Sequence, residues 1–165
     1  MRTDRIKFHR DTAAHIRRTG RSIIGVFPCE GDDGLPFAYT IGNDLKGLPE
    51  LLVIGTSDGG FLDDLSRLMI AAGHTFEDGQ TFQMAGARVP VKLIRANFSA
   101  TADYTIQAGV FFGHHDYAVM QVLLPDRVGR FPGEPGCQQP YESAPVLRRG
   151  LHWEVVDFWN AQGSA

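Results

Sequence analysis

Cysteine is scarce in this sequence, and long apolar runs are absent. The two cysteines, Cys29 and Cys137, lie far apart and each stands beside Pro or Gly, a pattern typical neither of a disulfide framework nor of a zinc site. No apolar run approaches the roughly 20 residues that span a bilayer, and the charged amino terminus lacks the apolar stretch of a signal peptide. We therefore expect a soluble protein with reduced thiols, located in the cytoplasm.

The sequence also lacks the common catalytic signatures. It contains no Walker loop, dinucleotide-binding fingerprint, nucleophile elbow or His-Glu-x-x-His motif. These reaction classes are disfavoured, and no motif indicates a particular reaction. Whether the protein is an enzyme is left open, and no resident metal is predicted.

Net charge is only −3, but it is distributed unevenly. Residues 1–21 contain seven Arg or Lys against two Asp, which leaves the remainder of the chain strongly acidic. We predict a basic helical arm over 1–21, with a helix near 11–19, followed by one domain over 22–165. The basic residues are not interleaved with aromatics, so a solvated helix face that docks on the acidic body of the same chain is favoured over nucleic-acid binding.

The stretch 36–55 holds two β-type runs, each closed by glycine. Together with 22–27 it predicts a three-stranded antiparallel meander. The period of two places Tyr39 on the core face and Thr40 on the opposite face, where its hydroxyl is expected to meet open space. Both residues are candidates for ligand contact, although Tyr39 is expected mainly to pack in the core.

The rest of the chain predicts further helices and strands. Helical spacing favours helices near 58–72 and 100–111, and alternation favours a strand within 88–96. The apolar run after Asp116 predicts a strand buried on both faces, and a Gly/Pro-rich loop covers 126–140. The predicted fold class is therefore α+β: a single domain with a mostly antiparallel sheet curled toward a split barrel and about three helices.

Several polar groups are candidates for a site. His114, His115 and Asp116 offer metal-ligand or acid–base chemistry, although adjacent residues of an extended segment point to opposite faces. Gln121 interrupts the buried strand and is either a satisfied core group or part of a site. Other candidates are helix-start residues Thr56 and Ser57, with loop residues Arg127, Arg130 and Cys137.

Successive sequence blocks resemble a known bacterial family, the domain-of-unknown-function family 4262. The blocks are Phe-Ala-Tyr-Thr-Ile-Gly at 37–42, Pro-Glu-Leu-Leu-Val at 49–53, Gln-Val at 121–122, Pro-Asp at 125–126, Gly-Arg-Phe-Pro at 129–132 and Glu-Pro-Gly-Cys at 134–137. Two positions depart from the family pattern: Leu48 stands where His often precedes Pro-Glu, and Gly133 where Trp is common. The resemblance implies a small bacterial protein and carries no catalytic residue with it.

The order of elements is also similar, more loosely, to that of flavin-reductase-like split barrels. By that analogy Thr40, Thr56, Ser57 and Arg130 would hold a flavin phosphate. The leading hypothesis is thus binding of a small anionic or flavin-like ligand, with redox chemistry, where Tyr39 and Thr40 meet the 57–60 helix start and the 126–137 loop. The alternatives are a non-catalytic protein-interaction module and a metal-assisted hydrolase using His114, His115 and Asp116. A homodimer is also expected.

Overall fold

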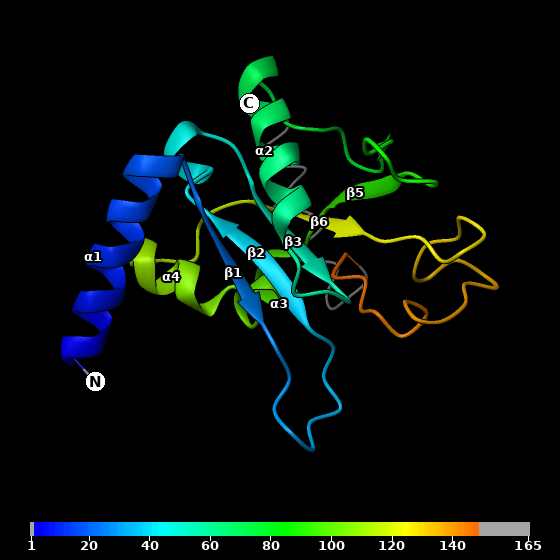
Figure 1. Ribbon diagram of the computed structural model, residues 1–165, viewed down its shortest axis with the longest axis horizontal. Coiled ribbons are helices and arrows are strands. Elements are labelled where there is room, and N and C mark those ends of the chain that lie inside the picture. The colour runs from blue at the N-terminus through cyan, green and yellow to red at the C-terminus, as the bar shows by residue number, and fades with distance from the viewer. Residues whose placement is uncertain (1, 149–165) are drawn as a thin grey trace.

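A six-stranded sheet runs through the centre of the protein (Figure 1). The computed structural model describes residues 2–148. The elements are α1 (Arg2–Thr19), β1 (Ser22–Val26), β2 (Phe37–Ile41), η1 (Asp44–Lys46), β3 (Glu50–Ile54), α2 (Gly60–Ala72), β4 (Thr81–Phe82), β5 (Val91–Arg95), α3 (Phe98–Ala102), α4 (Ile106–Phe112) and β6 (Val119–Leu123). In the described range, no helix is both long and apolar enough to cross a lipid bilayer.

The strand order is β1-β2-β3-β6-β5-β4. Strands β1, β2 and β3 form the predicted antiparallel meander, in which Ile24 pairs with Tyr39 and Tyr39 with Leu52. Strand β6 then pairs parallel to β3 and antiparallel to β5. All five residues of β6 are buried, as its apolar run predicted. The α+β class and the mostly antiparallel sheet are therefore confirmed.

The prediction of a barrel-like curl is wrong. The sheet is open, with β1 and β4 at its two edges, and β1 does not pair with β4. The parallel β3–β6 pair explains the difference, because a parallel neighbour requires a long crossover rather than a hairpin. That crossover carries α2, β4, β5, α3 and α4, so the chain returns to the middle of the sheet instead of closing it.

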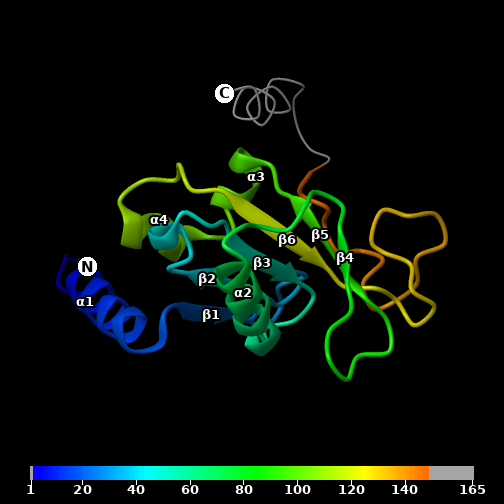
Figure 2. The same cartoon turned by 90° about the horizontal axis from the view of Figure 1, so that it is seen from above.

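Helices cover both faces of the sheet (Figure 2). Helix α2 packs Leu62, Leu65 and Met69 against one face, in a cluster that includes Ala38 and Leu51. The other face carries Tyr39 and Leu52, together with Ala108 of α4 and Ile16 of α1. Neighbouring residues of one strand thus enter different cores, as the period of two requires.

Two helices differ from their predicted bounds. Helix α1 begins at Arg2, well before the predicted start, although only its second half is buried, through Thr12 and Ile16. The helix predicted near 100–111 is divided into α3 and α4. At the break, the Thr105 hydroxyl lies 2.7 Å from Tyr117 Oη, so the Thr105 side chain forms a hydrogen bond with the segment between α4 and β6. The predicted helix ends are confirmed at Gly20 and Gly73.

Candidate anion-binding cleft between α1 and α4

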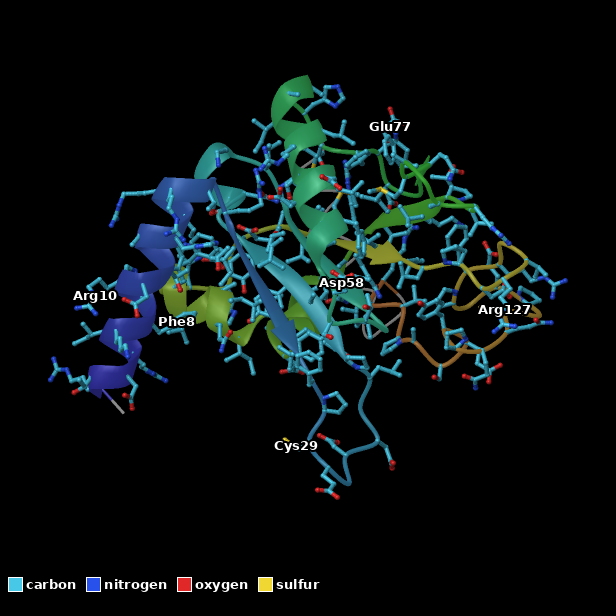
Figure 3. All side chains as sticks on the ribbon, viewed as in Figure 1. Phe8, Arg10, Cys29, Asp58, Glu77 and Arg127 are labelled. Atoms are coloured by element: carbon cyan, nitrogen blue, oxygen red, sulfur yellow. The ribbon has the colours of Figure 1, made fainter. Side chains whose placement is uncertain are left out.

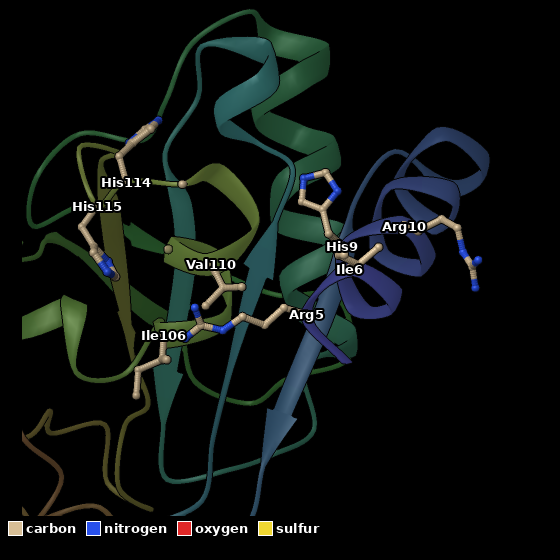
Figure 4. A pocket seen from close by; sticks show the side chains of 10 residues that line it. Arg5, Ile6, His9, Arg10, Ile106, Val110, His114 and His115 are labelled. Atoms are coloured by element: carbon tan, nitrogen blue, oxygen red, sulfur yellow. The ribbon is translucent and has the colours of Figure 1, made fainter. Parts of the chain in front are cut away.

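A cleft of about 880 Å³ lies where the first turns of α1 pass α4 and the turn that follows it (Figure 4). Its apolar lining comes from Ile6, Ile106 and Val110, and glycines 109 and 113 lie between them. Basic or imidazole side chains complete the lining: Arg5, His9, Arg10, His114 and His115. Among residues 2–148 no carboxylate lines this cleft, so the charge that these residues give it is positive and its walls are apolar.

Arg5 is the permanent cation directed into the cleft. Its side chain extends from α1 toward Ile106 and Val110 of α4 (Figure 4). Arg5 is exposed and forms no hydrogen bond or ion pair with another residue in 2–148. Arg10 also lines the cleft, but its guanidinium end points away from α4, and its Nε lies 3.3 Å from Asp11 Oδ1.

His115 lies directly on the backbone of α4 because residue 109 is glycine. A Cβ atom at position 109 would lie only 2.0 Å from Cε1 of the His115 ring. The other side of the ring contacts Tyr117, whose Oη lies 3.4 Å from His115 Nδ1. Gly109 therefore makes room for the imidazole at the edge of the cleft.

The hydrogen bonds of Tyr117 indicate which nitrogen carries the proton in the neutral ring of His115. Tyr117 Oη donates one hydrogen and lies 2.7 Å from Thr105 Oγ1 and 3.1 Å from the Thr105 carbonyl oxygen. With that hydrogen directed to Thr105, the contact to His115 requires that Nδ1 carry the imidazole proton. We therefore assign the Nδ1-protonated tautomer to neutral His115, which leaves Nε2 as an acceptor.

His114 has the opposite tautomer. Its Nδ1 accepts a hydrogen bond of 3.0 Å from the backbone N–H of Asp116, so Nε2 carries the proton and is a donor. His9 is oriented by stacking on Phe111, with 4.8 Å between ring centroids. The cleft thus combines a guanidinium group with imidazoles from α1 and from the turn that follows α4.

The predicted His114, His115 and Asp116 cluster does not form a metal-ligand set. Both imidazoles line the cleft, whereas Asp116 is not among its lining residues. Over residues 2–148 no group of three or more His, Cys, Asp or Glu side chains is placed to hold a metal ion. The structure therefore gives no geometric support to the metal-assisted hydrolase alternative.

A buried polar network lies at the start of β3, beside the segment that leads from His115 into β6. Glu50, the first residue of β3, is fully buried, and its Oε1 accepts hydrogen bonds from the backbone N–H groups of Gly42 at 2.8 Å and Asp44 at 3.0 Å. Desolvation raises the pKa of Glu50 to about 7, although hydrogen bonds from Thr40 and these amides oppose the shift. The carboxylate joins the turn after β2 to the start of β3.

Asn43 extends this network to α2. Its Nδ2 donates to Ser66 Oγ at 2.9 Å and to the Pro49 carbonyl oxygen at 3.2 Å, and its Oδ1 accepts from Arg21 Nε at 3.3 Å. Arg21 is also buried and is paired with Asp63. The sequence did not mark Glu50, Asn43 or Arg21 as candidate site residues. The available signal was a glutamate at the head of an otherwise apolar strand, where a buried charge needs hydrogen-bonding partners.

Thr40 and Tyr39 are both inside the protein. Tyr39 is buried as predicted, and its hydroxyl lies 3.3 Å from the backbone nitrogen of Gln107. The expectation that the Thr40 hydroxyl faces open space is wrong, because α2 covers that face of the sheet. Thr40 Oγ1 instead donates to Glu50 and accepts from the N–H of Leu51 at 2.9 Å.

The other predicted ligand contacts are divided between the two ends of the sheet. Thr56 and Ser57 follow β3, and the 126–137 loop follows β6, so the parallel pairing of these two strands places both segments at the same end of the sheet. Thr40 lies toward the other end, because Phe37 rather than Thr40 pairs with Ile54 at the end of β3. The structure therefore brings together part of the predicted site and separates Thr40 from it.

Gln121 is a satisfied core group. Its Nε2 donates to the Pro145 carbonyl oxygen at 2.7 Å, and its Oε1 accepts from the Leu147 N–H at 2.8 Å. Both hydrogen bonds attach the 145–147 segment to the central strand. Of the two possibilities that the sequence left for Gln121, a hydrogen-bonded core group and part of a site, these contacts correspond to the first.

The loop after β6 is organised around Asp126. Its carboxylate accepts hydrogen bonds of 2.8 to 2.9 Å from the backbone N–H groups of Val128, Arg130 and Gln138. Arg130 Nη1 donates to the Gly136 carbonyl oxygen at 2.7 Å. Arg127 is exposed at the outside of the loop (Figure 3). Arg130 thus stabilises the loop itself.

A family model described as a domain of unknown function, DUF4262, matches residues 15–138. The chain belongs to the DUF4262 family. The matched range contains the sheet, the Glu50 network and the Asp126 loop, and it includes α4 with His114 and His115. It leaves out the first turns of α1, so Arg5 and His9 lie outside the DUF4262 match. No curated protein and no solved structure matches the chain.

Proposed function

We propose that the cleft between α1 and α4 binds a small anionic ligand that carries an apolar body. The observation that carries this proposal is the guanidinium of Arg5, which has no ion-pair partner in the described part of the chain and is directed along an apolar wall where no described carboxylate lies. A guanidinium recognises carboxylate or phosphate through two parallel hydrogen bonds. Ile6, Ile106 and Val110 would contact the apolar part of the ligand.

The imidazoles add directional contacts to this charge. His114 offers an Nε2–H donor, and His115 offers its Nε2 lone pair, according to the tautomers assigned above. Clefts that bind small molecules usually enclose about 300 to 1,000 Å³ and combine apolar walls with a few polar groups. The volume of about 880 Å³ falls within that range and accommodates a ligand as large as a flavin mononucleotide.

Calorimetric titration with matched charged and neutral probes tests the proposal. Suitable pairs are flavin mononucleotide with riboflavin, and benzoate with benzyl alcohol. At least one anion is expected to bind, with its neutral analogue weaker by about tenfold or more, because the charged hydrogen bond is lost. Inorganic phosphate shows whether the anionic head alone is sufficient.

A pair of arginine variants locates the binding. Arg5→Gln is expected to weaken the anion by about tenfold or more. Arg10→Gln removes a cation from the same helix that is paired with Asp11 and points away, so affinity should change less than about twofold. Equal binding of the neutral analogues, absence of binding across the panel, or wild-type affinity in Arg5→Gln would refute the proposal.

A further inference from the structure

The tip of the β1–β2 hairpin, residues 27–34, stands out from the body of the protein (Figures 1 and 3). Every residue of this hairpin tip is exposed, and the Phe27 side chain is 73% exposed. Phe27 directly follows β1 and leaves a large apolar ring in water at the base of this tip. The hairpin tip therefore presents an unpartnered apolar group.

The hairpin tip is also acidic. Glu30, Asp32 and Asp33 give it a net charge of −3, and it contains no Lys or Arg. None of these carboxylates forms an ion pair with another residue of the described chain. A partner for this surface would need to be basic and to offer an apolar contact for Phe27.

The first turns of α1, residues 2–10, have those properties. These basic turns carry Arg2, Arg5, Lys7 and Arg10 against Asp4, for a net charge of +3. Ile6 is 63% exposed among them, and Ile106 of α4, across the cleft, is 59% exposed. The two surfaces are therefore complementary both in charge and in their apolar contacts.

The hairpin tip and the basic turns cannot satisfy each other within one molecule, because they stand apart in Figure 1. In Figure 1 the basic turns lie beside the sheet at its lower left, and the hairpin tip extends below it, so both are on the lower side of the body. A two-fold axis on that side would bring each hairpin tip to the basic turns of the other copy, in two equivalent contacts. We infer that the partner of the hairpin tip is a second copy of this chain, bound in such a reciprocal dimer.

The dimer is expected to be weak and sensitive to salt. Its ion pairs lie at exposed positions, where screening reduces their attraction, and the apolar contact is limited to Phe27 against Ile6 and Ile106. The inference does not rest on the proposed ligand. Arg5, Ile6 and Ile106 belong to both surfaces, however, so the tests must separate the two roles.

Charge reversal tests the reciprocal contact in the full-length chain. Sedimentation and light scattering over a concentration series would compare wild type with Asp33→Lys, Arg5→Glu and the double variant. Each single variant is expected to raise the dimer Kd by about tenfold or more, because like charges then face each other. The double variant should recover much of the loss, since both reversed charges meet again across the axis. Raising the salt concentration should weaken the wild-type dimer.

Arg127→Glu is the matched control, because it reverses an exposed arginine on the distant loop after β6. Thermal unfolding confirms that each variant is folded. A wild-type chain that remains monomeric at all accessible concentrations overturns the inference. So do single reversals that dimerise like wild type, or a control that weakens the dimer equally. Asp33→Lys keeps Arg5, so its anion titration shows whether ligand binding fails independently of the dimer.

Discussion

The hydroxyl of Thr40 donates a hydrogen bond of 2.6 Å to Oε2 of Glu50, inside the protein and between two neighbouring strands. The other carboxylate oxygen holds the backbone of the turn that joins these strands. A buried carboxylate is tolerated when its oxygens are hydrogen-bonded in this way. The meander is thus fixed by one polar side chain as well as by its backbone hydrogen bonds.

This burial makes the stability of the protein depend on pH. The pKa of Glu50 is raised by desolvation from its ordinary value to about 7. Between those two values the unfolded chain ionises while the folded protein keeps its proton, so rising pH favours unfolding. The free energy of unfolding is expected to fall by about 3 kcal/mol from this group across that window, and to fall no further above it.

Glu50→Gln isolates the contribution of this carboxyl from that of other titrating groups. Glutamine can still accept the two backbone N–H bonds but cannot ionise, so the difference in unfolding free energy between wild type and variant should shrink as pH rises from about 4.5 to 7. Urea unfolding of both proteins at closely spaced pH values measures this difference in unfolding free energy. A difference that is constant across this window would contradict the raised pKa.

The sequence predicted the strands of the meander and the faces to which their residues point. Tyr39 packs in the core as its alternation with Thr40 indicated. Alternation distinguishes two faces, but it cannot show that both are covered. The exposure of Thr40 was therefore mispredicted: whether α2 lies over that face depends on tertiary packing.

The cleft could not be assembled from local pattern. Arg5 belongs to helical turns in which only Phe8 is partly buried, so no apolar periodicity marked the start of α1. His115 was identified as chemically capable, but its neighbours depend on how α1 crosses α4. Gly109 would have been a useful signal, because a glycine within a helix often marks a close approach by another group.

Gly109→Ala should displace His115 from the edge of the cleft. The added methyl group would meet the imidazole ring, and the side chain can rotate outward more easily than the backbone of α4 can move. The fold should be kept, since alanine favours helix. Nuclear magnetic resonance of the His115 ring protons should show a changed environment and loss of the contact with Tyr117.

Gly60→Ala is the matched control for this substitution. It adds the same methyl group at the start of α2, where the new Cβ would lie 3.4 Å from Asp58 Oδ1, its nearest neighbour. It should change the unfolding free energy by less than about 1 kcal/mol and leave the His115 signals unchanged. Wild-type His115 signals in Gly109→Ala would show that the ring does not rest on this glycine.

Asp126→Ala should release the loop that follows β6. Desolvation raises the pKa of Asp126, but the amides of Arg130, Gln138 and Val128 outweigh it and hold the pKa below the ordinary value. Removing the carboxylate leaves three loop amides without their acceptor.

Trypsin cleavage after Arg127 and Arg130 should become severalfold faster, because proteolysis follows local opening. Asp116→Ala removes an exposed aspartate elsewhere, so trypsin should cleave this variant at the wild-type rate. Equal cleavage rates in the two variants would show that Asp126 does not hold the loop in place.

The two thiols should differ in reactivity. Cys29 is exposed on the hairpin tip, whereas Cys137 is partly covered, and its pKa is raised by desolvation and by the carboxylates of Asp126 and Glu134. Only the thiolate attacks a disulfide reagent, so Cys137 should react more slowly and accelerate as the pH is raised. Reaction with an aromatic disulfide near neutral pH should show a fast and a slow phase.

Cys29→Ser should lose the fast phase and Cys137→Ser the slow one. A fast phase that persists in Cys29→Ser would mean that Asp126 and Glu134 do not suppress the thiolate of Cys137.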